Sequence, residues 1–508
     1  MSPAGPGIGA RGAWFWGGCG AIVLGVGLHL PMLAAAHAMG NRAAGMPMAD
    51  TMLWGMALIA AGALAAFYGV LPPHTLRMAP QDGRVWEAPD ETPLGRWHWA
   101  LLEMMVLGMI IDTMKPATLG FVLPGLRAEY GISKSAAALL PFAALTGTAL
   151  GSLVWGWLAD IHGRRVSIML STILFVATSI CGAMPSFGWN LAMCFLMGCS
   201  AGGMLPVVYT LLTEIMPSRH RSWVLVLVGG LGLVGGYLAA GATAYLFEPG
   251  YGWRSLWLQG FPTGIALLVL ARFIPESPQF LRGAGREREL AMLTHRYGIV
   301  ARAPEPSREP AAATSPRLTG ALVVTALAWS FVNFGLLLWL PFDLRERGFS
   351  AGLASGILTQ SALLALPTIV LAAIAYSRWS SKWTLVAAIG LTLAGLVGAA
   401  LPAVVPASTT VLVGIIALLL IGTNATIAVL LPYAAENYPL RVRGRATGTI
   451  AASSKLGGIA VQGLALMGIV PTLGAAAGAP ILPLVGAALL VAAAGRETRG
   501  VSLRRLET

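Results

Sequence analysis

Long stretches of uncharged apolar residues limit the possible folds of this chain more than any other feature. A helix needs about 20 apolar residues to cross the hydrocarbon core of a bilayer, which is about 30 Å thick. Only 11% of the 508 residues are charged, whereas soluble domains carry about 25%. We therefore predict an all-α integral membrane protein, which excludes a soluble enzyme and a nucleic-acid-binding protein. The fourteen candidate segments lie at 14–36, 52–72, 97–124, 136–158, 166–184, 189–215, 223–247, 254–274, 318–342, 351–376, 383–402, 410–434, 446–470 and 475–494.

Lysine and arginine gather in alternate loops, and this sets the predicted orientation, because cytoplasmic loops retain basic residues. With the start of segment 97–124 placed in the cytoplasm, the inner loops and the tail hold 21 basic residues. An even number of segments then puts both termini in the cytoplasm, and we expect a multi-pass protein of the bacterial inner membrane. The outer loops of the same twelve segments hold five basic residues, which are Arg127, Lys134, Arg254, Arg345 and Arg347.

A polar stretch at 276–317 divides the last twelve segments into two sets of six. A short repeat supports this division, because the block 213–222 recurs at 435–444 with its Glu, its Pro and both Arg in register. Internal repeats of this kind are typical of secondary transporters, whose two halves are structurally related. The predicted organisation is an extra helix pair with its connection at 1–96, six-helix halves at 97–275 and 318–494, a cytoplasmic linker at 276–317 and a cytoplasmic tail at 495–508.

The first apolar segment has an alternative interpretation as a signal peptide. Arg11 precedes the apolar run, and Ala36-His37-Ala38 resembles a cleavage site. However, the run is longer than the 7–15 residues of a typical signal-peptide core, and a second apolar segment follows at once. A retained helix pair is therefore the favoured prediction.

Three motifs carry a resemblance to a known family. The loop after the fourth segment reads GWLADIHGRR at 156–165, PESPQFL occupies 275–281, and the repeat blocks are the third motif. Together they resemble the major facilitator superfamily of secondary transporters, in particular its sugar porters and metabolite:proton symporters. The resemblance implies a 6+6 helix bundle with a pseudo-two-fold axis, here with two extra N-terminal helices. It also implies a monomeric transporter that works by alternating access, and not an enzyme.

The same resemblance implies a latch on the cytoplasmic side that controls which side of the protein is open. Asp160 is expected to interact with the neighbouring end of segment 446–470 and so to hold the two halves together. The Glu and Arg residues of the repeat blocks are expected to form an accompanying charge relay, and none of these groups should contact substrate. The implied latch residues are Gly156, Asp160, Gly163, Arg164, Arg165, Glu214, Arg221, Glu436 and Arg443.

Two charges lie deep within segment 97–124. An ionised side chain at mid-bilayer costs about 2.5–3.5 kcal/mol on insertion scales, so it is a candidate functional group. Asp112 and Lys115 are three residues apart, which allows them to pair on one helix face, and Pro116 is expected to bend the helix there. We interpret Asp112 as the proton-binding group and Lys115 as the group that holds an anionic substrate. The alternative is a permanent structural ion pair.

A second intramembrane lysine, Lys455, lies about a third of the way along segment 446–470 with no acid near it in the sequence. It either faces a central cavity or extends to the cytoplasmic interface. In the first case, two lysines beside one acid favour a carboxylate substrate. Candidate hydrogen-bonding groups for the substrate are Asn333, Gln360 and Asn424, and candidate stacking groups are Trp329, Phe331, Phe334 and Trp339. For each aromatic side chain, packing against lipid or a neighbouring helix is the more common role.

These observations predict a secondary transporter that moves a small organic anion together with protons through the lipid bilayer. The chain has no ATP-binding motif, so the expected energy source is a gradient and no cofactor is expected. Cys19, Cys181, Cys194 and Cys199 lack CxxC spacing, so no thiolate metal site is expected. Two alternatives stay open. One is a copper transporter that uses methionine thioethers near His29, and the other is a sensor or accessory membrane subunit.

Overall fold

The computed structural model describes residues 7–71, 85–302, 316–401, 408–438, 440–469 and 473–499. Within these ranges the chain is almost entirely helical, and twelve helices are long and apolar enough to cross a membrane. The two remaining predicted segments are helical as well, as a shorter apolar helix at Ser255–Ala271 and as α20 (Leu440–Leu466). The prediction of an all-α membrane protein with about fourteen segments is confirmed.

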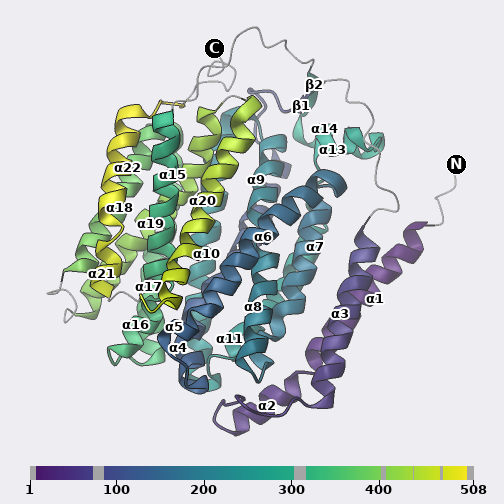
Figure 1. Ribbon diagram of the computed structural model, residues 1–508. Helices are drawn as coiled ribbons and strands as arrows, with labels where there is room; N and C mark the ends of the chain where they lie inside the picture. Colours follow the sequence, from purple (N-terminus) through teal and green to yellow (C-terminus); the bar gives the residue numbers. More distant parts are fainter. Residues whose placement is uncertain are drawn as a thin grey trace.

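The first six-helix half is formed by residues 96–271, and its helices run side by side in Figure 1. Pro116 lies inside α4, which nevertheless continues as a single helix until Gly131 caps it with a φ of 62°. Glycine suits this left-handed cap position because it has no Cβ. The elements are α4 (Arg96–Tyr130), α5 (Lys134–Ala137), α6 (Leu139–His162), α7 (Arg164–Ala177), η1 (Thr178–Ala183), α8 (Phe187–Ala201), α9 (Met204–Ile215), α10 (Ser218–Tyr251), α11 (Ser255–Leu258) and α12 (Gly260–Ala271).

The second half repeats this plan, with one local departure. Its first spanning unit changes from α-helix to a seven-residue π-helix, η2, before it resumes as α16. Such distortions are often found at functional sites because they re-aim side chains and free backbone groups. The elements are α15 (Pro316–Ser330), η2 (Phe331–Leu337), α16 (Leu340–Glu346), α17 (Ala351–Arg378), α18 (Ser381–Ala400), α19 (Thr409–Asn437), α20, α21 (Leu473–Gly478) and α22 (Ile481–Ala494).

A small polar layer covers one end of the bundle, which we call the linker end; the opposite end is the far end. Here β1 (Val85–Glu87) pairs with β2 (Val300–Arg302) as an antiparallel two-stranded sheet. Figure 1 shows this sheet beside α13 (Pro278–Gly283) and α14 (Glu287–Tyr297). The sheet therefore ties the segment before α4 to the segment that precedes the second half.

The extra N-terminal pair forms a hairpin of α1 (Gly7–Gly27), α2 (Leu30–Ala38) and α3 (Asp50–Val70). It stands at the edge of the bundle and packs against α7 (Figure 1). Glycines allow α1 and α3 to pack closely, because a Cβ built at Gly62 would lie 2.7 Å from the Gly18 carbonyl oxygen. Small residues at such contacts are typical of membrane helix pairs.

A buried ion pair anchors this hairpin at the far end. The carboxylate of Glu129, at the end of α4, pairs with Arg254 at 2.8 Å. The same carboxylate accepts hydrogen bonds of 2.7 Å from the backbone N–H groups of Ala43 and Ala44, in the loop after α2. The hairpin is therefore fixed to the first half by charge-assisted hydrogen bonds, which are stronger than neutral ones.

The two halves meet along two seams, where α10 packs against α17 and α6 packs against α20. One continuous cluster of buried apolar side chains joins elements of both halves. Polar side chains on α4 and α20 at mid-membrane depth are consequently close to the boundary along which the halves would move.

Candidate functional site

Asp112 and Lys455 are opposite charges within the membrane-spanning helices of the two different halves. Asp112 on α4 is 6% exposed, and Lys455 on α20 is partly buried. Lys455 and Lys115 are the two basic side chains that lie near enough to act on the Asp112 carboxylate. Asp112 is likewise the charged group that acts on Lys455.

These two charges do not form a direct ion pair in this conformation. Within the described ranges, neither side chain has a hydrogen-bond partner or an opposite charge within 4.0 Å. A buried carboxylate without a partner is costly, and it persists where function requires it.

Lys115 does not belong to this pair, and the predicted Asp112–Lys115 ion pair is wrong. Its Nζ donates hydrogen bonds of 2.6 Å to the carbonyl of Phe175 and 2.7 Å to the hydroxyl of Thr178. It also lies 4.4 Å from the centre of the Phe175 ring, and Gly260 packs against its aliphatic chain. The end of α7 supplies these contacts, because the last carbonyls of a helix lack intrahelical partners and attract cations.

We expect the variant Lys115→Met to be less stable but still able to transport. Methionine keeps the buried volume and removes two hydrogen bonds of a charged donor, so a loss of about 1–3 kcal/mol of stability is expected. Thermal unfolding of the purified protein and uptake per folded molecule would measure the two effects separately. Loss of uptake at an unchanged melting temperature would instead indicate that Lys115 takes part in transport.

Aromatic and amide groups of the second half gather next to Lys455. Phe334 of η2 packs against Gly458, one turn beyond Lys455 on α20. Its ring meets Trp329 edge to face, with 5.8 Å between the ring centres. The amide of Gln462 donates a 2.7 Å hydrogen bond to the Phe334 carbonyl, which satisfies a backbone group in the π-helix. Gln462 was not among the sequence candidates.

The predicted amide candidates have different positions. Asn424 is buried on α19 and donates a 2.8 Å hydrogen bond to the Leu420 carbonyl. Asn333 is half-buried within η2, one residue before Phe334. Gln360 does not reach the site, because it is exposed on α17. It shares a face with the exposed apolar side chains of Leu363 and Leu364, as expected for residues three and four apart.

Among the described residues, four ion pairs join the halves at the far end. Lys134, in the first half, pairs with Asp343 at 2.9 Å, and Arg345 of the second half pairs with Glu248 at 2.6 Å. Glu346 pairs with Arg127 at 2.9 Å and with Lys134 at 3.5 Å. Sequence reasoning noted these basic residues as loop charges but could not assign their partners.

Weakening these pairs should open the far end. In the double variant Asp343→Asn and Glu248→Gln, two of these four pairs lose their negative partner, and the two pairs of Glu346 remain. Partly exposed pairs contribute up to about 1 kcal/mol each, so the closed-to-open ratio should fall roughly tenfold. A cysteine at position 338, in a background without native cysteines, should then react faster with a membrane-impermeant thiol reagent. Equal labelling rates would show that the pairs do not control the far end.

The predicted latch loop forms a compact charge network at the linker end. Arg164 pairs with Glu214 at 3.0 Å and with Asp160 at 3.5 Å. The Asp160 side chain is 77% exposed. Among the described residues its ion-pair partner is Arg164. The side chains at the start of α20, where Asp160 is expected to bind, lie outside the described residues.

A buried acid that was not predicted as a site residue holds this loop in place. Glu276, from the PESPQFL motif, accepts a 2.7 Å hydrogen bond from the backbone N–H of Arg164 and a 3.4 Å one from that of Arg165. Burial raises the pKa of the Glu276 carboxyl, and these hydrogen bonds oppose that shift. Gly163 has a φ of 102°, and a Cβ there would lie 2.4 Å from the Glu276 carboxylate. The loop therefore requires glycine at this position.

The remaining latch candidates are only partly brought together. Glu214 pairs with Arg164, whereas Glu436 accepts hydrogen bonds from Tyr376 at 2.7 Å and from Ser222 of the other half. Gly156 lies on α6 with open space around it. Arg221 lines a cavity between the halves. The side chain of Arg443 lies outside the described residues.

The part of the chain that the structure describes contains no group of three His, Cys, Asp or Glu side chains that could hold a metal ion. His29 is buried in the N-terminal hairpin, where Nδ1 bonds the Gly25 carbonyl at 2.7 Å. Its Nε2 has no hydrogen-bond partner. No observation at this histidine favours the copper alternative over packing within the hairpin.

Comparison with known proteins identifies proteins that are similar to this chain. A sequence model of the Major Facilitator Superfamily matches residues 105–462. The chain is 27% identical over 388 residues to the niacin transporter NiaP of Acinetobacter baylyi, an alignment that covers 73% of this chain and 87% of NiaP. It is 30% identical over 297 residues to a gallate transporter of Pseudomonas putida, covering 55% of this chain and 65% of that protein.

A solved structure has the same fold. The xylose transporter XylE from E. coli, in a partially occluded inward open conformation, superposes with a TM-score of 0.63 at 17% sequence identity. The superposition covers 80% of this chain and all of XylE.

Proposed function

The chain belongs to the major facilitator superfamily, and from that premise we propose that it carries a small aromatic carboxylate across the membrane together with a proton. Members of this superfamily are transporters, so the chain is a multi-pass membrane transporter and not an enzyme. The observation that carries the proposal is the pair of unpartnered opposite charges, Asp112 and Lys455, on opposite sides of the boundary between the halves.

The surroundings of Lys455 support an aromatic carboxylate as cargo. An ammonium group suits a carboxylate, and the half-buried ring of Phe334, held edge to face by the buried Trp329, offers apolar surface one turn away. Aromatic rings stack or meet edge to face with a gain of about 0.5–1.5 kcal/mol beyond burial. Niacin and gallate, which are named as the cargo of two relatives, are both aromatic rings with a carboxylate.

The same charges explain coupling to a proton. When Asp112 is ionised, its carboxylate attracts Lys455 across the boundary and competes with an anionic substrate for that ammonium. A proton on Asp112 removes this competition, so Lys455 is free to pair with the substrate carboxylate. The loaded site is then neutral, which lowers the cost of moving it through the membrane interior.

Alternating access follows from the two ends of the bundle. The far-end ion pairs hold that end closed, and the linker end, which we propose is cytoplasmic, carries the charge network of Arg164 and Glu276. We propose that proton and substrate binding releases one end as the other closes. In this account both termini are cytoplasmic, the protein lies in the bacterial inner membrane, and one chain is sufficient for transport.

Uptake by purified protein in liposomes tests this proposal. Radiolabelled nicotinate, gallate and 4-hydroxybenzoate should accumulate when the outside is made acidic, and a proton uncoupler should abolish the accumulation. Xylose, which lacks a carboxylate, and nicotinamide serve as matched controls. Accumulation of a control compound, or none of any aromatic acid with or without a gradient, would contradict the proposed cargo.

A further inference from the structure

A cavity of about 1150 Å³ lies at the linker end between the two halves. The start of α10 forms one wall, and the ends of α17 and α19 form the other. Asp112, Lys455 and Asn424 do not line it. Asn424 precedes the lining residue Pro432 by eight residues on α19, or about 12 Å at 1.5 Å per residue. The cavity is therefore separate from the mid-membrane site.

The mouth of this cavity is strongly basic, and its positive charges come from both halves. Arg219 and Arg221 of α10, Arg378 of α17 and Arg499 line it. Arg499 donates a hydrogen bond to the Arg378 carbonyl, which holds this rim together. Within the described ranges no carboxylate lies within 4.0 Å of the guanidinium groups of Arg219 and Arg378.

The two acids of the lining do not neutralise Arg219 and Arg378. Asp90 accepts a hydrogen bond from the Ser218 hydroxyl. Glu436 is occupied by the hydroxyl groups of Ser222 and Tyr376. The mouth therefore offers guanidinium donors that suit the oxygens of a phosphate group, for which arginine geometry is well matched.

The deeper part of the cavity is apolar and open to the side. Leu225 and Leu227 of α10 and Val370 and Ile374 of α17 line it. Val370 is 43% exposed and Ile374 is 46% exposed. Because these residues lie on a membrane-spanning helix, their exposed apolar surface suits contact with an acyl chain. A free phosphate ion would not contact these apolar side chains.

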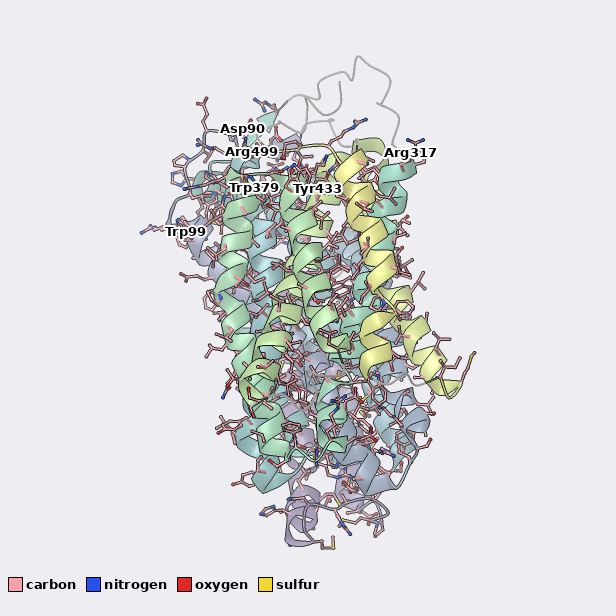
Figure 2. All side chains as sticks on the ribbon, turned by 90° about the vertical axis from the view of Figure 1, so that its left-hand side faces the viewer. Asp90, Trp99, Arg317, Trp379, Tyr433 and Arg499 are labelled. Atoms are coloured by element: carbon pink, nitrogen blue, oxygen red, sulfur yellow. The ribbon has the colours of Figure 1, made fainter. Side chains whose placement is uncertain are left out.

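The cavity mouth also lies at the depth of the lipid headgroups. Figure 2 shows Trp379 close to Arg499 and Asp90 at this end of the bundle. Trp379 is exposed, and Trp223 lines the cavity itself. Exposed tryptophans of membrane proteins concentrate at the interface between headgroups and acyl chains.

We propose that this cavity binds an anionic phospholipid, with its phosphate between Arg219 and Arg378 and its acyl chains against Leu227 and Val370. Basic pockets between membrane helices on the cytoplasmic side suit such headgroups. Since the two arginines belong to different halves, the bound lipid joins the halves at the linker end. It stabilises the conformation with the closed far end, independently of which cargo the mid-membrane site takes.

The full-length protein in lipid nanodiscs tests this site. Adding phosphatidylglycerol to phosphatidylcholine nanodiscs should raise the melting temperature of the wild type by about 2–5 °C, and native mass spectrometry should detect retained phosphatidylglycerol. The variant Arg219→Gln with Arg378→Gln should lose both effects. The variant Arg286→Gln with Arg296→Gln removes the same charge from α14 and the residue before it, outside the cavity, and should keep both.

Three outcomes would overturn the proposal. The first is an equal effect of phosphatidylglycerol on both double variants, which would indicate general surface charge. The second is an equal stabilisation by inorganic phosphate with phosphatidylcholine alone, which would indicate a free-anion site. The third is a wild type that neither retains the lipid nor gains stability from it, a result that does not depend on how the variants fold.

Discussion

Replacing Asp112 with Asn should abolish uphill accumulation of substrate while exchange of substrate across the membrane continues. The asparagine amide has nearly the same shape as the carboxyl group but cannot bind and release a proton, so the imposed pH gradient can no longer drive transport. Lys455 is then permanently free of competition from a carboxylate. We expect gradient-driven accumulation in liposomes to fall by about 100-fold or more, while counterflow of labelled substrate stays close to the wild-type rate.

A carboxylate on the same helix provides the matched control. Glu103 is exposed on α4, away from the boundary between the halves, and Glu103→Gln should transport like the wild type. If the Asp112→Asn protein still accumulated substrate against a gradient, Asp112 would not be the group that couples transport to protons. Loss of counterflow together with accumulation would show that Asp112 serves the fold or the binding step instead.

Replacing Lys455 with Gln should weaken binding of the anionic substrate. Hydrogen bonds to charged groups contribute about 1.5–3 kcal/mol, which corresponds to a roughly 10- to 150-fold rise in the dissociation constant. The uncharged amide of the same aromatic acid should bind the variant and the wild type about equally, because it has no charge for Lys455 to recognise. Ligand binding to the purified protein measures both values.

Lys115→Met is the control for this experiment. It also removes a buried lysine, but one that bonds Phe175 and Thr178 within the first half, so its affinity for the acid should not change. Equal losses of affinity in both lysine variants would contradict the assignment of Lys455. The assignment would also be contradicted if the Lys455→Gln protein bound the acid more tightly than the amide, as the wild type is expected to do.

The sequence predicts the fold well because the relevant signals are local. The length and apolarity of each spanning segment are visible in about 20 consecutive residues. The loop at 156–165 also requires specific residues at fixed spacing, since Gly163 needs a positive φ and Arg164 must reach Glu214. Glu276 belongs to a motif that was noted, yet its contact with this loop joins residues that are 112 positions apart and is visible only in the fold.

The site was harder to predict because its contacts depend on helix orientation. The three-residue spacing placed Asp112 and Lys115 together, but a long flexible lysine chain can leave its helix face. It instead reaches the carbonyl of Phe175, where α7 gives way to η1. The sequence at 166–184 read as one continuous helix, so this acceptor was not foreseen. The position of Gln360 was hard to predict for a related reason. Nothing in its apolar segment indicates which helix face is in contact with lipid.

Substrate-coupled proton movement tests the central claim most directly. Liposomes that contain the protein and an internal pH dye are given an aromatic acid outside, with no pH gradient at the start. Our account predicts that the interior acidifies as the acid enters, faster than in protein-free liposomes, and that Asp112→Asn liposomes lose this protein-dependent acidification. Protein-dependent entry of the acid at the wild-type rate without any protein-dependent acidification would contradict the account.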